Sequence, residues 1–132
     1  MGVSYLLDTH AFIWLTDPLT QRGNDVRRVL LETAEDVYVS AVSAFEVATK
    51  TRLGRLAAEP LLDAWDHTVT GLGAKPLPLS AEHARTAGLL AWEHRDPFDR
   101  LLVVQAEIEE LTLVTADTAI LAGPASRLLP WS

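Results

Sequence analysis

Short apolar runs alternate with longer amphipathic stretches along the chain. The short runs predict β-strands at residues 4 to 7, 37 to 39, 75 to 79 and 111 to 115, with an edge strand at 128 to 131. The longer stretches predict helices over residues 11 to 15, 25 to 35, 41 to 52, 60 to 70, 81 to 92 and 98 to 110. Strands that alternate with helices in this way predict an α/β fold, with a central, mostly parallel sheet of four to five strands flanked by helices.

The composition changes this picture little but narrows the chemistry. A chain of 132 residues with 48% hydrophobic residues can bury one core, and no repeat or linker divides it, so we expect a single domain over residues 1–132. Neither a signal-peptide pattern nor an apolar run of roughly 18 residues is present, so we expect a soluble cytoplasmic protein without a membrane role. The lack of cysteine leaves oxygen and imidazole as the available metal ligands.

The net charge of −7 argues at first against a nucleic-acid partner, because phosphate binding usually shows as a basic surplus. A site built from several carboxylates lowers the total charge, however, while a local basic rim remains. Candidates for such a rim are Lys50, Arg52, Arg55, Arg95 and Arg100. Each of them is equally compatible with an ordinary solvated surface position.

Two aspartates follow predicted strands directly. Asp8 comes after the first strand, and Asp117 comes shortly after the fourth. In open α/β sheets, ligands bind at the carboxyl ends of the strands, so both residues are candidates for a site. Either one could instead begin the next helix, because aspartate is favoured at helix N-caps.

Glu46 is a third candidate, on the helix predicted over residues 41 to 52. At 3.6 residues per turn it shares a stripe with Val42, Thr49 and Leu53, the side that is expected to face the sheet. The alternative is an ion pair with Lys50 one turn later. Such a pair stabilises a helix by about 0.3 kcal/mol and implies no function for Glu46.

The segment "HRDPFDRLLVVQA" contains two aspartates near the start of a helix. Asp96 as N-cap and Pro97 at the first helical position form a start signal. The helical projection places Asp99 on an apolar flank beside Ala106, whereas Arg100 falls on the solvent side. We therefore predict that Asp96 caps the helix and that Asp99 faces inward as a site residue.

Convergence of these acids would require a counter-charge. Two like charges 4 Å apart repel by about 4 kcal/mol at an effective dielectric of about 20. Oxygen ligands without cysteine favour Mg²⁺ or Mn²⁺, which polarise phosphoryl oxygens and activate water for phosphodiester hydrolysis. The histidines share no metal-ligand spacing and are predicted at surface positions or helix ends: His10, His67, His83 and His94.

Four segments occur together in an order that is similar to a known family. The segments "LLDTHAFIWL", "VSAVSAFEVATKTRLGRL", "HRDPFDRLLVVQA" and "LVTADTAI" cover nearly the whole chain. The ordered set resembles the PIN domain, and in particular the VapC toxins of bacterial toxin–antitoxin pairs. The resemblance implies a Mg²⁺- or Mn²⁺-dependent endoribonuclease that acts on structured RNA and is inhibited by a VapB-type antitoxin. It also implies a homodimer and a toxin–antitoxin hetero-oligomer.

The family's functional positions can be carried over one by one. The resemblance assigns the catalytic and metal-binding acids to Asp8, Glu46, Asp99 and Asp117. Thr9 and Thr115 match hydroxyl positions that support the metal site. Asp96 belongs to an "RDPFDR" variant found in part of the family and is assigned to the cap or to the outer shell of the site.

The mechanism that follows is a hypothesis. Three aspartates hold the metal directly or through water, and Glu46 ligates it or orients the attacking water. Lys50, Arg95 and Arg100 are the candidates for contact with RNA phosphate.

Other classes remain alternatives. A catalytically silent PIN fold would bind only its antitoxin. A receiver-like module would use the acidic pocket and Mg²⁺ to accept phosphate, but the chain lacks its adjacent acidic pair. A phosphoaspartate hydrolase would need an acid two residues after Asp8, where His10 stands.

Overall fold

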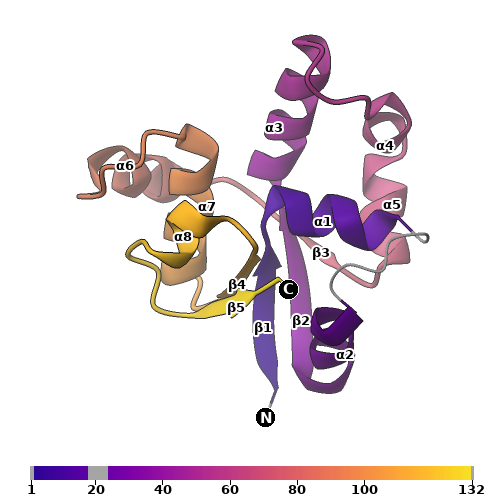
Figure 1. The fold of residues 1–132 in the computed structure, drawn as a ribbon, viewed down its shortest axis with the longest axis horizontal. Coiled ribbons are helices and arrows are strands. Elements are labelled where there is room, and N and C mark those ends of the chain that lie inside the picture. The colour runs from indigo at the N-terminus through magenta and orange to yellow at the C-terminus, as the bar shows by residue number, and fades with distance from the viewer. Residues whose placement is uncertain (1, 18–23, 132) are drawn as a thin grey trace.

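Five short strands form one parallel sheet in the order β3-β2-β1-β4-β5. The computed structural model describes residues 2–17 and 24–131 (Figure 1). The strands are β1 (Val3–Leu7), β2 (Ala34–Ser40), β3 (Lys75–Leu77), β4 (Thr112–Thr115) and β5 (Leu128–Pro130). Because all neighbouring pairs are parallel, the carboxyl ends of the strands meet at one edge of the sheet. The predicted α/β fold with a parallel sheet of up to five strands is therefore confirmed.

Helices connect the strands. They are α1 (Thr9–Thr16), α2 (Asn24–Thr33), α3 (Ala41–Arg52), α4 (Glu59–Asp63), α5 (Trp65–Gly71), α6 (Ala81–Leu89), α7 (Pro97–Ile108) and α8 (Thr118–Leu121). In the part of the chain that the structure describes, no helix combines the length and the apolarity that crossing a lipid bilayer requires.

The sheet is covered on both faces because successive strand residues point to opposite sides. Tyr5 and Leu7 of β1 belong to one apolar cluster, which includes residues of α1, α2 and α5. Leu6 belongs to a second cluster, formed with residues of α3, α7 and α8. These two clusters hold β1 and β4 in the middle of the molecule. They therefore fix the position of the sheet edge at which the carboxyl ends of both strands lie.

Several predicted boundaries differ from the structure, and two of them change the list of elements or their junctions. The helix predicted over residues 60 to 70 is two helices, because the backbone leaves helical geometry at Ala64 (φ −109°, ψ 24°). The hydrophobic pattern continues across this break since Leu61 and Trp65 pack on the same cluster. The helix predicted to reach residue 35 ends at Thr33, and β2 begins at Ala34, which pairs with Val3 of β1.

Candidate active site

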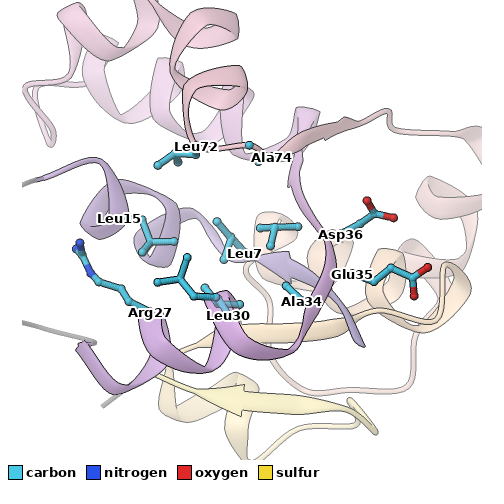
Figure 2. Close-up of a pocket in the computed structure, with 12 residues that line it drawn as sticks. Leu7, Leu15, Arg27, Leu30, Ala34, Glu35, Asp36, Leu72 and Ala74 are labelled. Carbon is cyan, nitrogen blue, oxygen red and sulfur yellow. The ribbon is translucent and has the colours of Figure 1, made fainter. Parts of the chain in front are cut away.

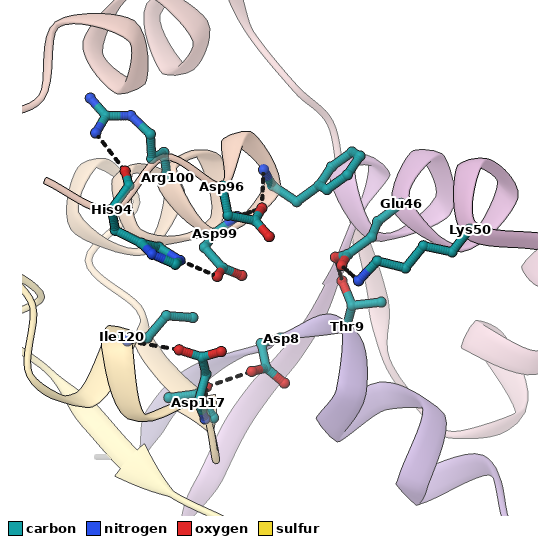
Figure 3. A network of polar contacts seen from close by, with 12 residues as sticks. Asp8, Thr9, Glu46, Lys50, His94, Asp96, Asp99, Arg100, Asp117 and Ile120 are labelled. Carbon is teal, nitrogen blue, oxygen red and sulfur yellow. Dashed lines mark hydrogen bonds and ion pairs between the residues drawn. The ribbon is translucent and has the colours of Figure 1, made fainter. Parts of the chain in front are cut away.

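The four predicted acids line one small cavity at the carboxyl edge of the sheet. Asp8 follows β1, Asp117 follows β4, Glu46 lies on α3 and Asp99 lies in the first turn of α7. The cavity measures about 100 Å³, and its lining is completed by Thr9, His10, Lys50 and Asp96. Figure 3 shows the side chains that surround it. The structure thus brings together residues that are separated by up to 109 positions in the sequence, from Asp8 to Asp117 (117 − 8 = 109).

Asp8 is both a helix cap and a lining residue of the cavity. Its Oδ1 accepts a hydrogen bond from the backbone N–H of Ala11 at 2.8 Å, and its Oδ2 accepts one from the Thr115 hydroxyl. The side chain is buried, which raises the pKa of Asp8, while the bonds from Thr115 and Ala11 act in the opposite direction. The Thr115 hydroxyl also accepts the N–H of Asp117 at 3.0 Å, so it links the chain ends of β1 and β4.

Glu46 satisfies both of the interpretations that the sequence left open. It is buried at the cavity, as the helical stripe predicted, and its Oε2 pairs with the Lys50 ammonium one turn later. Its Oε1 accepts a hydrogen bond from the Thr9 hydroxyl at 2.6 Å. Leu53, predicted on the same stripe, is 50% exposed, because α3 extends beyond the sheet edge (Figure 1). Both oxygens of Glu46 therefore already have partners.

The two aspartates of the "RDPFDR" segment lie in different local positions, although both line the cavity. Asp96 caps α7 and accepts hydrogen bonds from the N–H groups of Phe98 at 2.8 Å and Asp99 at 3.1 Å. The Asp99 side chain is only 16% exposed and turns into the cavity. Burial raises the pKa of Asp99 to about 6; a hydrogen bond from His94 opposes this, and the neighbouring carboxylates add to it.

Sequence reasoning missed two histidines of the site, His10, which lines the cavity, and His94, which contacts Asp99. Nε2 of His94 lies 2.7 Å from Oδ2 of Asp99, and this bond raises the pKa of His94. Ligand atoms of His94, Asp99 and Asp117 all lie within 4.8 Å of one another. The spacing of five residues between His94 and Asp99 crosses a helix start, where no simple periodicity applies. The two side chains are separated by Asp96, whose backbone is extended and not helical.

The prediction that Arg100 lies on the solvent side is wrong. Its guanidinium donates four hydrogen bonds to backbone carbonyls, with donor–acceptor distances between 2.6 and 3.1 Å. These carbonyls belong to Ala87, Leu90, Trp92 and His94. Arg100 therefore closes the segment after α6 against α7, and the predicted helix accordingly ends at Leu89 and not at residue 92. Its hydrogen bonds to these carbonyls compete with the phosphate contact that the sequence suggested.

The other two candidates for phosphate contact remain accessible. Lys50 lines the cavity and its side chain is 30% exposed, although its ammonium is paired with Glu46. Arg95 is exposed and precedes the start of α7 by two positions.

The donor set of the cavity fits a hard divalent cation. Five carboxylates line it, from Asp8, Glu46, Asp96, Asp99 and Asp117, against a single ammonium. Among the described residues, no hydrogen bond reaches Oδ1 of Asp99 or Oδ2 of Asp117, and the two carboxylates point toward each other in Figure 3. Such free oxygens beside a surplus of negative charge suit Mg²⁺ or Mn²⁺.

A larger cavity lies elsewhere and has a different character. It measures about 460 Å³ and is lined by α1, α2, β2 and the chain after α5 (Figure 2). Its walls are mainly aliphatic, as at Leu15, Leu30 and Leu72, with the carboxylates of Glu35 and Asp36 on one side. None of the four predicted acids lines it. The acid-lined cavity is therefore the candidate active site.

Several solved structures have a similar fold, among them a chain of a toxin–antitoxin complex from Klebsiella pneumoniae, with a TM-score of 0.66 at 15% identity over 95% of both chains. A chain of VapBC2 from Rickettsia felis, bound to a DNA fragment from its promoter, superposes with a TM-score of 0.70 at 16% identity, covering 98% of this chain and 100% of that one. A chain of DNA-bound VapBC from Salmonella typhimurium gives 0.68 at 15% identity over 100% of both chains. A chain of FitAB bound to the IR36 DNA fragment gives 0.67 at 21% identity, covering 96% and 94%.

Comparison at the level of sequence is decisive for the family. No curated protein matches the chain. The sequence model of the PIN domain, however, matches residues 5–123, which include all four acids of the cavity. The chain therefore belongs to the PIN domain family.

Proposed function

We propose that this PIN domain is the toxin of a type II toxin–antitoxin pair. In this proposal it is a Mg²⁺- or Mn²⁺-dependent endoribonuclease that hydrolyses RNA phosphodiester bonds, works in the cytoplasm and is inhibited by a VapB-type antitoxin. The observation that carries the proposal is the convergence of Asp8, Glu46, Asp99 and Asp117 on one cavity. Membership of the PIN family supports a nuclease, and the fold of the VapBC and FitAB chains supports a toxin.

The aspartates of the cavity would hold the cation. Asp99 and Asp117 each offer an oxygen without a hydrogen bond, and Asp8 offers the remaining lone pairs of a carboxylate fixed by Thr115 and Ala11. A bound divalent ion would supply polarisation of a phosphoryl oxygen and activation of a water molecule. The hydroxyl of Thr115 keeps Asp8 in place and links it to Asp117. It thereby sets the spacing of two ligands from different strands.

Glu46 and Lys50 on α3, together with Arg95, would act on the RNA substrate. Glu46, held by Thr9, is placed to orient the attacking water and to accept its proton. The ammonium of Lys50 lies beside Glu46 and at the cavity, where it can compensate phosphate charge. Arg95, exposed near the start of α7, is placed to contact the RNA backbone outside the cavity.

The acidity of the chain also suggests how the antitoxin binds. A net charge of −7 and five carboxylates in one cavity favour a basic contacting segment, with an arginine placed among the acids. Substitution of arginines in the antitoxin segment should then restore RNA cleavage by the complex. A complex whose antitoxin leaves the cavity open to solvent would contradict this part of the proposal.

The test of the nuclease is cleavage of total RNA by antitoxin-free protein with added Mg²⁺ or Mn²⁺. Wild type should cut, and Asp8→Asn and Asp99→Asn should not, while Asp25→Asn, which changes an exposed carboxylate on α2, should cut like wild type. Circular dichroism of each variant establishes that it is folded. Undiminished cutting by either cavity variant would remove that residue from the mechanism. Absence of metal-dependent cutting by folded wild type would leave a PIN fold that only binds its partner.

A further inference from the structure

His94 places an imidazole nitrogen next to Asp99, one of the carboxylates that line the cavity. It comes from the segment between α6 and α7, and its ring points at Asp99 (Figure 3). One ring nitrogen of His94 and carboxylate oxygens of Asp99 and Asp117 form a group within 4.8 Å, and it is Nε2 that contacts Asp99. These three residues lie at the side of the cavity opposite the Glu46–Lys50 pair (Figure 3).

The spacing of these atoms is close to that of ligands around one ion. Adjacent vertices of an octahedron with metal–ligand bonds of about 2.1 Å lie about 3 Å apart, and opposite vertices lie about 4.2 Å apart. The 2.7 Å between His94 Nε2 and Asp99 Oδ2 is near the first value. The 4.8 Å limit of the group exceeds the second by an amount that small side-chain rotations can supply. An ion could therefore bind the nitrogen and the oxygens without a change in the backbone.

The imidazole is held in this position by its surroundings. The Trp92 ring lies 4.8 Å from the His94 ring, and the His94 carbonyl accepts a hydrogen bond from Arg100 at 3.0 Å. Trp92 is itself packed against Gly123, where an added Cβ would lie 2.8 Å from the indole. The His94 side chain is 27% exposed, so it is neither a free surface group nor buried in the apolar core. This packing reduces the conformational entropy that His94 would lose on ligation.

We propose that Nε2 of His94 is a direct ligand of the divalent ion, together with Asp99 and Asp117, and that this nitrogen shifts the selectivity of the site from Mg²⁺ toward Mn²⁺. Mg²⁺ prefers oxygen ligands, whereas imidazole binds transition metals well. The ring would ligate in its neutral form, with the remaining proton on Nδ1. The inference rests on the proposed function only in requiring a divalent ion in the cavity.

The test measures metal binding to the protein without RNA. Mn²⁺ and Mg²⁺ affinities come from calorimetric titration, and pulsed electron paramagnetic resonance of bound Mn²⁺ detects coupling to a ligand nitrogen. His94→Phe removes both ring nitrogens and keeps an aromatic ring against Trp92. His94→Gln keeps a group that can hydrogen-bond to Asp99 but has no imidazole. His67→Phe is the control, because His67 is exposed on α5 and belongs neither to the cavity lining nor to the three-residue group.

Wild type and His67→Phe should show the nitrogen coupling, and both His94 variants should lack it. Loss of a residue that supports a metal ligand typically weakens metal binding by about 10- to 100-fold. Loss of a nitrogen ligand that favours Mn²⁺ should weaken Mn²⁺ binding more than Mg²⁺ binding, so the preference for Mn²⁺ should fall by at least about tenfold. The ligand role is overturned by three results together: no nitrogen coupling in wild type, equal losses of Mn²⁺ and Mg²⁺ affinity in His94→Phe, and recovery of both affinities in His94→Gln. His94 would then be a positioning residue for Asp99.

The two proposals fail in different ways. Folded wild type that binds Mn²⁺ through nitrogen but does not cut RNA would contradict the nuclease and leave the His94 ligand intact. Metal-dependent RNA cutting without nitrogen coupling to bound Mn²⁺ would contradict the His94 ligand and leave the nuclease intact. Absence of any Mn²⁺ binding would overturn both the His94 ligand and the metal dependence of the nuclease.

Discussion

Replacement of Asp99 by asparagine should stabilise the metal-free protein while it removes the site. The Asp99 carboxylate is largely buried and faces other carboxylates, so its ionised form is disfavoured in the folded state. Its pKa rises from 3.8 to about 6. A group whose folded pKa lies above its unfolded pKa favours folding below the unfolded value, and that contribution is lost as the pH rises through the folded value. At neutral pH, the wild-type carboxylate therefore destabilises the metal-free fold.

The size of this effect follows from the shift in pKa. A shift of about two units corresponds to about 3 kcal/mol for a group fully shielded from water. Since the Asp99 side chain is 16% exposed and is hydrogen-bonded to His94, solvent screening lowers the effect, and we expect about 1 kcal/mol. Asparagine has the same shape and can keep a hydrogen bond to His94. For a domain of this size, about 1 kcal/mol raises Tm by about 4 °C.

A divalent ion should reverse the order of the two proteins. An ion at about one hundred times its Kd stabilises the folded state by about 2.7 kcal/mol. Wild type should gain this stabilisation and Asp99→Asn should not, because the variant loses an anionic ligand. Thermal unfolding at neutral pH, with a chelator and then with Mn²⁺, should show the variant as the more stable protein in chelator and wild type as the more stable one in Mn²⁺.

The matched control is Asp25→Asn, whose carboxylate is 77% exposed and lies on α2 outside the cavity. It should unfold like wild type in both conditions. The reasoning is refuted if Asp99→Asn is less stable than wild type in chelator, or if Mn²⁺ raises the Tm of the variant as much as that of wild type.

Three further predictions concern the same site. Asp96→Ala removes a helix cap and should lower the free energy of unfolding by about 0.5 to 2 kcal/mol in urea titrations, while folded protein keeps most of its RNA cleavage; complete loss of cleavage would show that Asp96 takes part in the chemistry. Thr115→Val leaves the buried Asp8 carboxylate and the Asp117 N–H each without one hydrogen bond. The free energy of unfolding should therefore fall by about 1 to 3 kcal/mol, and Mn²⁺ affinity should fall with it. An unchanged Mn²⁺ affinity would mean that Thr115 does not position the metal ligands. Mn²⁺ affinity of wild type should rise as the pH passes about 6, because Asp99 must lose its proton to ligate, and it should go on rising as His94, whose pKa is also raised, loses its own proton. Titration calorimetry at several pH values should show proton release over this range. An affinity that does not change near pH 6 would contradict the raised pKa of Asp99.

Features that depend on neighbours in the sequence were predictable. The alternation of strands and helices predicted the parallel sheet, since each element carries its own hydrophobic period. The helical projection separated Asp96 from Asp99, because a cap and the third helical position are related by fixed local geometry. It also placed Glu46 on the buried side of α3. In each case a few adjacent residues contain the whole physical cause.

Features that depend on distant partners were not predictable. The start of β2 at Ala34 is set by its pairing with β1, and the position of Arg100 is set by four carbonyls outside its helix. The partner of Ala34 lies 31 residues earlier (34 − 3 = 31), and the partners of Arg100 are backbone carbonyls of residues 6 to 13 positions before it, which no side-chain pattern marks. Arg100 accordingly looked like a solvent-exposed cation, although it closes the segment that carries His94.

The sequence by itself determined which acids follow the strands and which face of each helix is apolar, because these properties arise from local spacing. Only the tertiary structure decided that the four acids share one cavity, that Glu46 is both buried and paired with Lys50, and that His94 meets Asp99. Convergence depends on how β1 and β4 pair and on where α3 and α7 pack against them. Those arrangements are set by contacts between residues far apart in the chain, for which spacing along the sequence holds no information.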